Sequence, residues 1–154
     1  MLVEDLVGRK GMRGLWYSNG MFRGKEEVFK QQQKFRELVA CVKHNLDKSP
    51  AQIYEEARVI SKTIYNVGPN YIGEIMMTYA PNKLANINRN PITVLREAGN
   101  VDMKSHSQLF NGGDYEIYNG IVKEIGFKLG LNNMLEMDYF FNSIYQKMKN
   151  ASLV

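Results

Sequence analysis

The stretch Ile64-Tyr65-Asn66-Val67-Gly68-Pro69-Asn70-Tyr71-Ile72-Gly73 decides the fold, because it joins two helical patterns through a turn of three residues. Asn66 and Gly68 are residue types that adopt left-handed backbone conformations at low cost, so they predict a tight corner. Val67 lies between them and is expected to pack into the core. Apolar residues recur at helical spacing on both sides of the corner, at Ile53, Ala57, Ile60 and Ile64 before it and at Ile72, Ile75, Met76 and Tyr79 after it.

Outward from this corner, the same periodicity predicts an all-α fold of about six helices in one compact bundle. Ser49, Asn90 and Asp114 are the expected N-caps, and Gly99 and Gly130 are the expected stops. The expected helices cover residues 25–45, 49–66, 69–79, 90–99, 114–129 and 134–149.

The first 24 residues differ from the rest, because they hold five of the thirteen glycines. Asn19-Gly20 stands there between apolar and aromatic residues, and this dipeptide favours the positive-φ turn of a β-hairpin. We therefore expect a glycine-rich N-terminal arm or short β-hairpin over 1–24 and a helical domain over 25–154.

The composition is that of one globular domain, with 44% hydrophobic and 23% charged residues in a chain of 154. No stretch approaches the roughly 20 apolar residues of a membrane helix or has the character of a signal peptide, so a cytoplasmic protein without membrane contact is expected. The single Cys41 lies in an apolar run, which favours a small core residue over a reactive thiol. With only His44 and His106 beside it, a Cys/His zinc site is excluded, and no metal or cofactor is expected.

The positive charge is concentrated in the N-terminal third of the chain. Residues 1–48 hold ten Lys and Arg against six Asp and Glu, which gives +4, whereas residues 49–154 hold ten of each. Such asymmetry indicates an anionic partner, and the alternative is a solvated basic face.

The backbone at the start of the third helix is a candidate anion site. Pro69 has no N–H, but the amides of the next three residues are expected to point outward at the positive end of the helix dipole. The segment resembles the helix-hairpin-helix motif, with Asn66 where the motif usually has its first glycine. The resemblance implies contact with DNA phosphates, but not with bases, through Gly68, Asn70 and Tyr71. The alternative is an ordinary corner inside the core.

Basic side chains are the other expected phosphate contacts. Lys62 and Arg89 are expected to reinforce the positive potential near the corner. Arg13, Arg23 and Lys25 are expected to add charge from the basic N-terminal third.

A wider resemblance covers Val28 to Tyr145. Its motifs are Val67-Gly68-Pro69, Met76-Met77-Thr78-Tyr79-Ala80-Pro81, Ile87-Asn88-Arg89-Asn90-Pro91 and Leu135-Glu136-Met137-Asp138-Tyr139-Phe140-Phe141. In this order they resemble a helical module found ahead of the AAA+ motor in McrB-type restriction proteins. The resemblance implies a DNA-targeting role and an AAA+ motor or nuclease subunit as partner. The chain itself has no Gly-x-x-x-x-Gly-Lys-Ser/Thr loop.

No catalytic arrangement is evident in the sequence. Helix-hairpin-helix DNA glycosylases carry a catalytic aspartate downstream of the hairpin, whereas residues 86–91 here include no acid. Glu136 and Asp138 are two residues apart on one helix and point to different faces, so Asp138 is expected to bond the Asn88–Pro91 turn or to pair with Arg89. We therefore expect a DNA-binding or DNA-targeting accessory domain that is not an enzyme. The alternative is a protein–protein adaptor that docks a partner subunit and binds no nucleic acid.

Overall fold

The computed structural model describes residues 19–152, with side chains from Gly24 onward, and every regular element in this range is helical. The all-α prediction is therefore confirmed for the described residues. The elements are α2 (Asn19–Lys30), α3 (Gln32–His44), α4 (Pro50–Ser61), α5 (Pro69–Tyr79), α6 (Arg89–Thr93), the π-helical segment η1 (Val94–Ala98), the 3₁₀ turn η2 (Ser107–Leu109), α7 (Gly112–Leu129) and α8 (Met134–Asn150). None of the helices from 19 to 152 combines the length and apolar character needed to cross a membrane.

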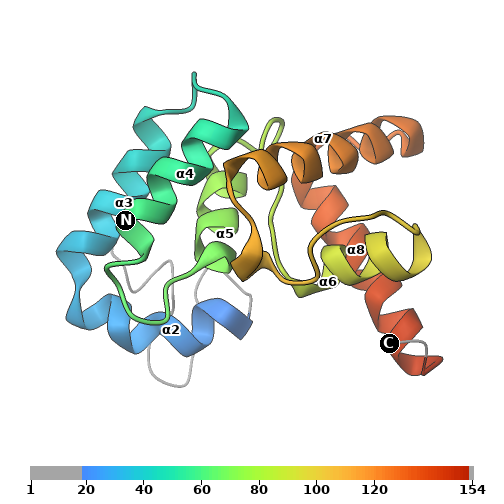
Figure 1. The fold of residues 1–154 in the computed structure, drawn as a ribbon, viewed down its shortest axis with the longest axis horizontal. Coiled ribbons are helices and arrows are strands. Elements are labelled where there is room, and N and C mark those ends of the chain that lie inside the picture. The colour runs from blue at the N-terminus through green and yellow to red at the C-terminus, as the bar shows by residue number, and fades with distance from the viewer. Residues whose placement is uncertain (1–18, 153–154) are drawn as a thin grey trace.

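α5 is the centre of the N-terminal helices, and α6, α7 and α8 form a second group beside them (Figure 1). α3 and α4 pack against each other and against α5, and α2 contacts both α3 and α5. α7 packs on α4 and on α8, while α6 and η1 lie against α8. The N-terminal helices are thus joined to the C-terminal half through the α4–α7 contact and through the contact of α5 with η2.

The core is built on α5, because this helix is apolar on nearly all sides. Eight of its eleven residues are buried, which is typical of a helix enclosed by others. Tyr54 of α4 stacks on Tyr115 of α7 with ring centroids 4.7 Å apart and an interplanar angle of 5°, and both side chains are fully buried. This stacked pair joins the two halves of the core through a large apolar contact.

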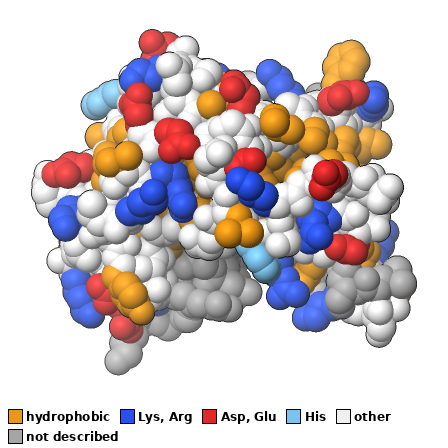
Figure 2. Space-filling model, in the orientation of Figure 1, with side chains coloured by type: hydrophobic (Ala, Val, Ile, Leu, Met, Phe, Trp, Pro, Cys, Tyr) orange, Lys and Arg blue, Asp and Glu red, His pale blue; other side chains and the backbone are white. Residues whose placement is uncertain are grey.

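The surface in Figure 2 carries charges of both signs and one concentration of hydrophobic side chains. Lys and Arg side chains alternate with Asp and Glu over most of the visible face. Hydrophobic side chains gather at the upper right, where Figure 1 places α7.

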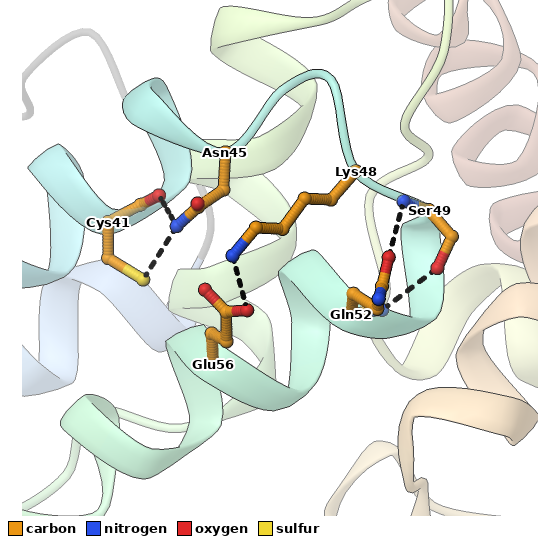
Figure 3. A network of polar contacts seen from close by, with 6 residues as sticks. All are labelled: Cys41, Asn45, Lys48, Ser49, Gln52 and Glu56. Carbon is orange, nitrogen blue, oxygen red and sulfur yellow. Dashed lines mark hydrogen bonds and ion pairs between the residues drawn. The ribbon is translucent and has the colours of Figure 1, made fainter.

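The connection between α3 and α4 is fixed by side chains at the start of α4 (Figure 3). Ser49 accepts a hydrogen bond from the backbone of Gln52, whose side chain accepts one from the backbone of Ser49, both at 3.2 Å. Lys48 adds an ion pair with Glu56 at 2.7 Å. This capping box confirms Ser49 as the predicted N-cap.

Cys41 is half-buried near the end of α3, whereas a buried core position was predicted for it. Its Sγ lies 3.6 Å from Asn45 Nδ2, which also donates to the Cys41 carbonyl oxygen at 2.7 Å (Figure 3). Burial raises the pKa of the Cys41 thiol, so the thiolate is disfavoured at neutral pH.

Several predicted boundaries are confirmed. α5 spans Pro69–Tyr79 as expected, with proline at its first position. α7 ends at Gly130, whose φ of 67° lies in the left-handed region, and α8 begins at Met134.

Other boundaries differ from the predictions. α2 begins at Asn19, so Asn19-Gly20 starts a helix and does not form the predicted hairpin turn, while residues 1–18 lie outside the described range. The predicted first helix is divided at Gln31, whose φ of −125° and ψ of 43° are not helical. Asp114 is not the N-cap of α7, since Asn111 caps it and Asp114, the third residue of the helix, completes the capping box. Similarly, Asn88 and not Asn90 caps α6.

Candidate functional site

The chain makes a tight corner at residues 64–73, as predicted, but only one of the two expected residues has a left-handed backbone. Asn66 takes the left-handed conformation, with φ 59°. Gly68 has φ −121° and ψ −159°, so it is not left-handed, and it is the N-cap of α5. A Cβ atom on Gly68 would lie 2.8 Å from Nε2 of Gln108 in η2, so a glycine here lets that side chain approach closely. Val67 is 4% exposed, as predicted.

The corner is covered by its own chain. Tyr71 is only 1% exposed, so the residue expected to contact a DNA phosphate lies within the core. Its ring meets Phe35 of α3 edge to face at 6.1 Å, and Gly24 of α2 lies directly against it. Asn70 is half-buried, and its Oδ1 accepts a hydrogen bond from Ser107 Oγ at 3.1 Å. The Tyr71 side chain is therefore not accessible to a nucleic acid.

Two of the three amides expected to hold a phosphate are already used. The N–H groups of Tyr71 and Ile72 both donate to the Gly68 carbonyl oxygen, at 3.0 and 3.2 Å. Of the predicted set, this leaves the amide of Asn70 for an anion. A single N–H donor binds an anion much more weakly than the three donors that were predicted.

The predicted basic residues are not gathered at one surface. Lys62 is exposed at the C-cap of α4, next to the corner. Arg89 lies over the ring of Tyr145 of α8, 6.0 Å from its centroid, and not at the corner. Lys25 is 7% exposed and so adds little to a solvent-facing basic surface. The side chains of Arg13 and Arg23 lie outside the described residues.

The segment between α5 and α6 is held by α7. Tyr115 Oη donates to the Ala85 carbonyl oxygen at 2.7 Å, and Tyr118 Oη donates to the Asn86 carbonyl oxygen at 2.6 Å. Asn119 Oδ1 accepts from the Ala85 amide at 2.7 Å. These contacts were not predicted, although the i, i+3, i+4 spacing of the three α7 side chains is a sequence signal for them.

One buried amide joins two carboxylates from different helices. Asn86 Nδ2 donates to Glu74 Oε1 at 3.1 Å and to Asp138 Oδ1 at 3.2 Å. Burial raises the pKa of Asp138, while hydrogen bonds from Asn86 and Asn88 lower it. The 3.2 Å hydrogen bond of Asp138 is thus made to Asn86, two residues before the predicted Asn88–Pro91 turn, and Arg89 lies over Tyr145 instead. The contact with Glu74 was not predicted. The adjoining cavity has no space for a water molecule, so this cluster has no room for a substrate.

The outer face of α8 forms an open apolar groove of about 500 Å³. Tyr139 is 77% exposed there and Leu135 is 52% exposed. At the end of the preceding helix, Phe127 of α7 is 86% exposed. The groove is lined by Leu131, Leu135, Glu136, Tyr139, Phe140 and Ser143. Large apolar side chains exposed together in this way are typical of an interaction surface.

Comparisons with protein-family models, with curated proteins and with solved structures find no match to the chain. The resemblance to McrB-type modules therefore stays a prediction. Among residues 19–152, no group of three or more His, Cys, Asp or Glu side chains is arranged to hold a metal ion.

Proposed function

We propose that this chain is a protein-docking domain that binds its partner through the apolar surface of α7 and α8. The groove on α8 is the observation that supports this proposal most strongly. Of the eight large hydrophobic side chains exposed in the described part, five belong to these two helices: Ile117, Phe127, Leu129, Leu135 and Tyr139. Tyrosine and phenylalanine are enriched at the centres of protein interfaces, where they bury large areas.

The charges around this surface are balanced. Glu124 and Lys128 of α7 form an ion pair at 2.6 Å, and Glu136 accepts hydrogen bonds from the backbone and side chain of Asn132. A rim with both signs suits a protein partner, whereas the uniformly negative backbone of nucleic acid favours a rim of cations. The McrB-type resemblance suggests an AAA+ motor or nuclease subunit as one such partner.

Capture of the partner with matched variants tests the proposal. The tagged chain is used to isolate bound proteins from cells that express it, and each purified candidate is titrated against three chains by calorimetry. These are the parent, Tyr139→Ser and Tyr65→Ser, because Tyr65 is exposed to a similar extent, at 71%, but follows α4. Tyr139→Ser is expected to weaken binding by about 10- to 30-fold, and Tyr65→Ser to leave it unchanged. If no partner loses affinity for the Tyr139 variant, the docking proposal fails.

Nucleic-acid contact is the second candidate function, supported by cations near the corner. Lys34 Nζ lies 3.5 Å from the Thr63 carbonyl oxygen, Lys62 is exposed, and Arg58 reaches the Gln108 carbonyl oxygen at 3.4 Å. The excess of positive charge in residues 1–48 adds to this potential. This proposal concerns the phosphate backbone alone.

A salt series with duplex DNA tests the second candidate. The logarithm of the binding constant is expected to fall with the logarithm of salt concentration, and Lys34→Ala with Lys62→Ala should reduce the slope by roughly 0.9 for each lost phosphate contact. Lys123→Ala with Lys128→Ala, on exposed positions of α7, is the control. A slope near zero for the parent would remove this candidate.

A further inference from the structure

α8 carries a second stripe beside its buried face, in which three residues are half-buried and Lys147 is exposed. Phe140 of this stripe also packs against the core with part of its ring. Glu136, Phe140, Ser143 and Lys147 follow one another at intervals of four, three and four residues, which is the spacing of a helix–helix seam. The buried stripe of the same helix consists of Met134, Met137, Phe141, Tyr145 and Met148. The outer stripe coincides with the groove through three of its four members.

The outer stripe is complementary to itself when it is reversed. Glu136 and Lys147 are equally distant from the midpoint between Phe141 and Asn142, and so are Phe140 and Ser143. In an antiparallel pair of α8 helices about that midpoint, each acid therefore faces a base and each phenylalanine faces a serine. A small residue opposite a large one lets two helices approach closely, and antiparallel helix dipoles oppose each other favourably.

A parallel pair lacks this complementarity. It would place Glu136 against Glu136 and Lys147 against Lys147, and like charges across an interface are destabilising. Tyr139, with 77% of its surface exposed, lies beside the seam and would be covered in the antiparallel arrangement.

The geometry points to a second copy of this chain as the occupant of the α8 groove, with the two α8 helices antiparallel across a two-fold axis. This inference rests on the proposed docking function and names its partner. A two-fold interface uses the same patch on both copies, so it requires the self-complementarity that the stripe provides.

Sedimentation velocity of the full chain over a concentration series tests this inference. The chains compared are the parent, Lys147→Glu, Glu136→Lys and the double variant with both changes. The parent is expected to form a dimer, and each single reversal should weaken the dimer by about 5- to 30-fold because two ion pairs become like-charge contacts. The double variant should return to within about threefold of the parent, since the pairs are restored with their charges exchanged.

Thermal unfolding of each variant establishes that it is folded, because Glu136 also binds Asn132 at the start of α8. If the Glu136 variants do not fold, Ser143→Phe provides the test, since it would set two phenylalanines against each other and should also abolish the dimer. A parent that stays monomeric up to about 100 µM overturns the inference. The docking function then survives if Tyr139→Ser still weakens the binding of a captured partner. If it does not, the docking function and the dimer inference both fail.

Discussion

Gly24 of α2 lies directly against the ring of Tyr71 of α5. A Cβ atom on Gly24 would stand 2.7 Å from Tyr71 Cε2 and 2.8 Å from the Asn66 carbonyl oxygen. The absence of a side chain at Gly24 thus allows α2 to cover the corner at residues 64–73. This contact explains why the residue expected to face a phosphate is instead 1% exposed.

Replacing Gly24 by alanine should destabilise the protein, although alanine is normally the better helix former. The new methyl group would meet a backbone oxygen that cannot move independently, and we expect a loss of about 1–3 kcal/mol in the free energy of unfolding. Gly120 of α7 is the control, because nothing lies within 4 Å of its Cβ position. Gly120→Ala should stabilise the protein by about 0.5–1 kcal/mol. Urea unfolding measures both, and equal effects would mean that α2 does not rest on Tyr71.

Removing the Tyr118 hydroxyl should also destabilise the fold. Tyr118→Phe leaves the buried carbonyl oxygen of Asn86 without this donor, at an expected cost of about 1–2 kcal/mol. Tyr139→Phe removes the same group from a side chain that is 77% exposed and should change stability by less than about 0.5 kcal/mol. Chemical unfolding of both variants at pH 7 measures the difference. Indistinguishable stabilities would show that α7 does not fix the segment between α5 and α6.

The raised pKa of Asp138 makes a specific prediction about pH. Because burial favours the neutral carboxyl, the folded chain binds a proton more tightly than the unfolded chain at this site. Stability from this group is therefore present below the ordinary aspartate pKa and is lost as pH rises through the raised value. Asp138→Asn lacks this titration, so its stability relative to the parent should increase over that interval and then remain constant.

Unfolding free energies of the parent and of Asp138→Asn, measured from about pH 3.5 to 7, test this dependence. Taking the difference removes the titration of acids distant from this site. Asp102→Asn is the control, because Asp102 is exposed. The free energy of unfolding of Asp138→Asn minus that of the parent should rise with pH. A value that stays constant or falls as pH rises would contradict the assigned pKa shift.

Local signals predicted much of the helical framework. Pro69 at the first position of α5 and Pro81 after it marked that helix, and Ser49 and Gly130 marked the start of α4 and the end of α7. Each of these residues acts on its own backbone or on that of its near neighbours. The local sequence is therefore sufficient to predict these helix boundaries.

The covering of the corner could not be predicted in the same way. Tyr71 is buried because α2 and Phe35, which are distant in sequence, pack on it. The sequence around Gly24 contains no pattern that predicts its contact with Tyr71. The pairing of Glu74 with Asp138 through Asn86 likewise depends on three separate segments. Such sites arise from tertiary packing, which periodicity within one helix does not reveal.

The central claim is that the outer face of α8 is a docking surface, and hydroxyl-radical labelling in cells tests it most directly. Tyr139 and Tyr65 are exposed to 77% and 71% in the isolated chain, so both should be labelled in dilute purified protein. In cells that express the chain, labelling of Tyr139 should fall several-fold while that of Tyr65 is retained, because a bound partner covers α8. If Tyr139 is labelled in cells as strongly as in the dilute purified protein, the claim is contradicted. This holds whatever the labelling of Tyr65.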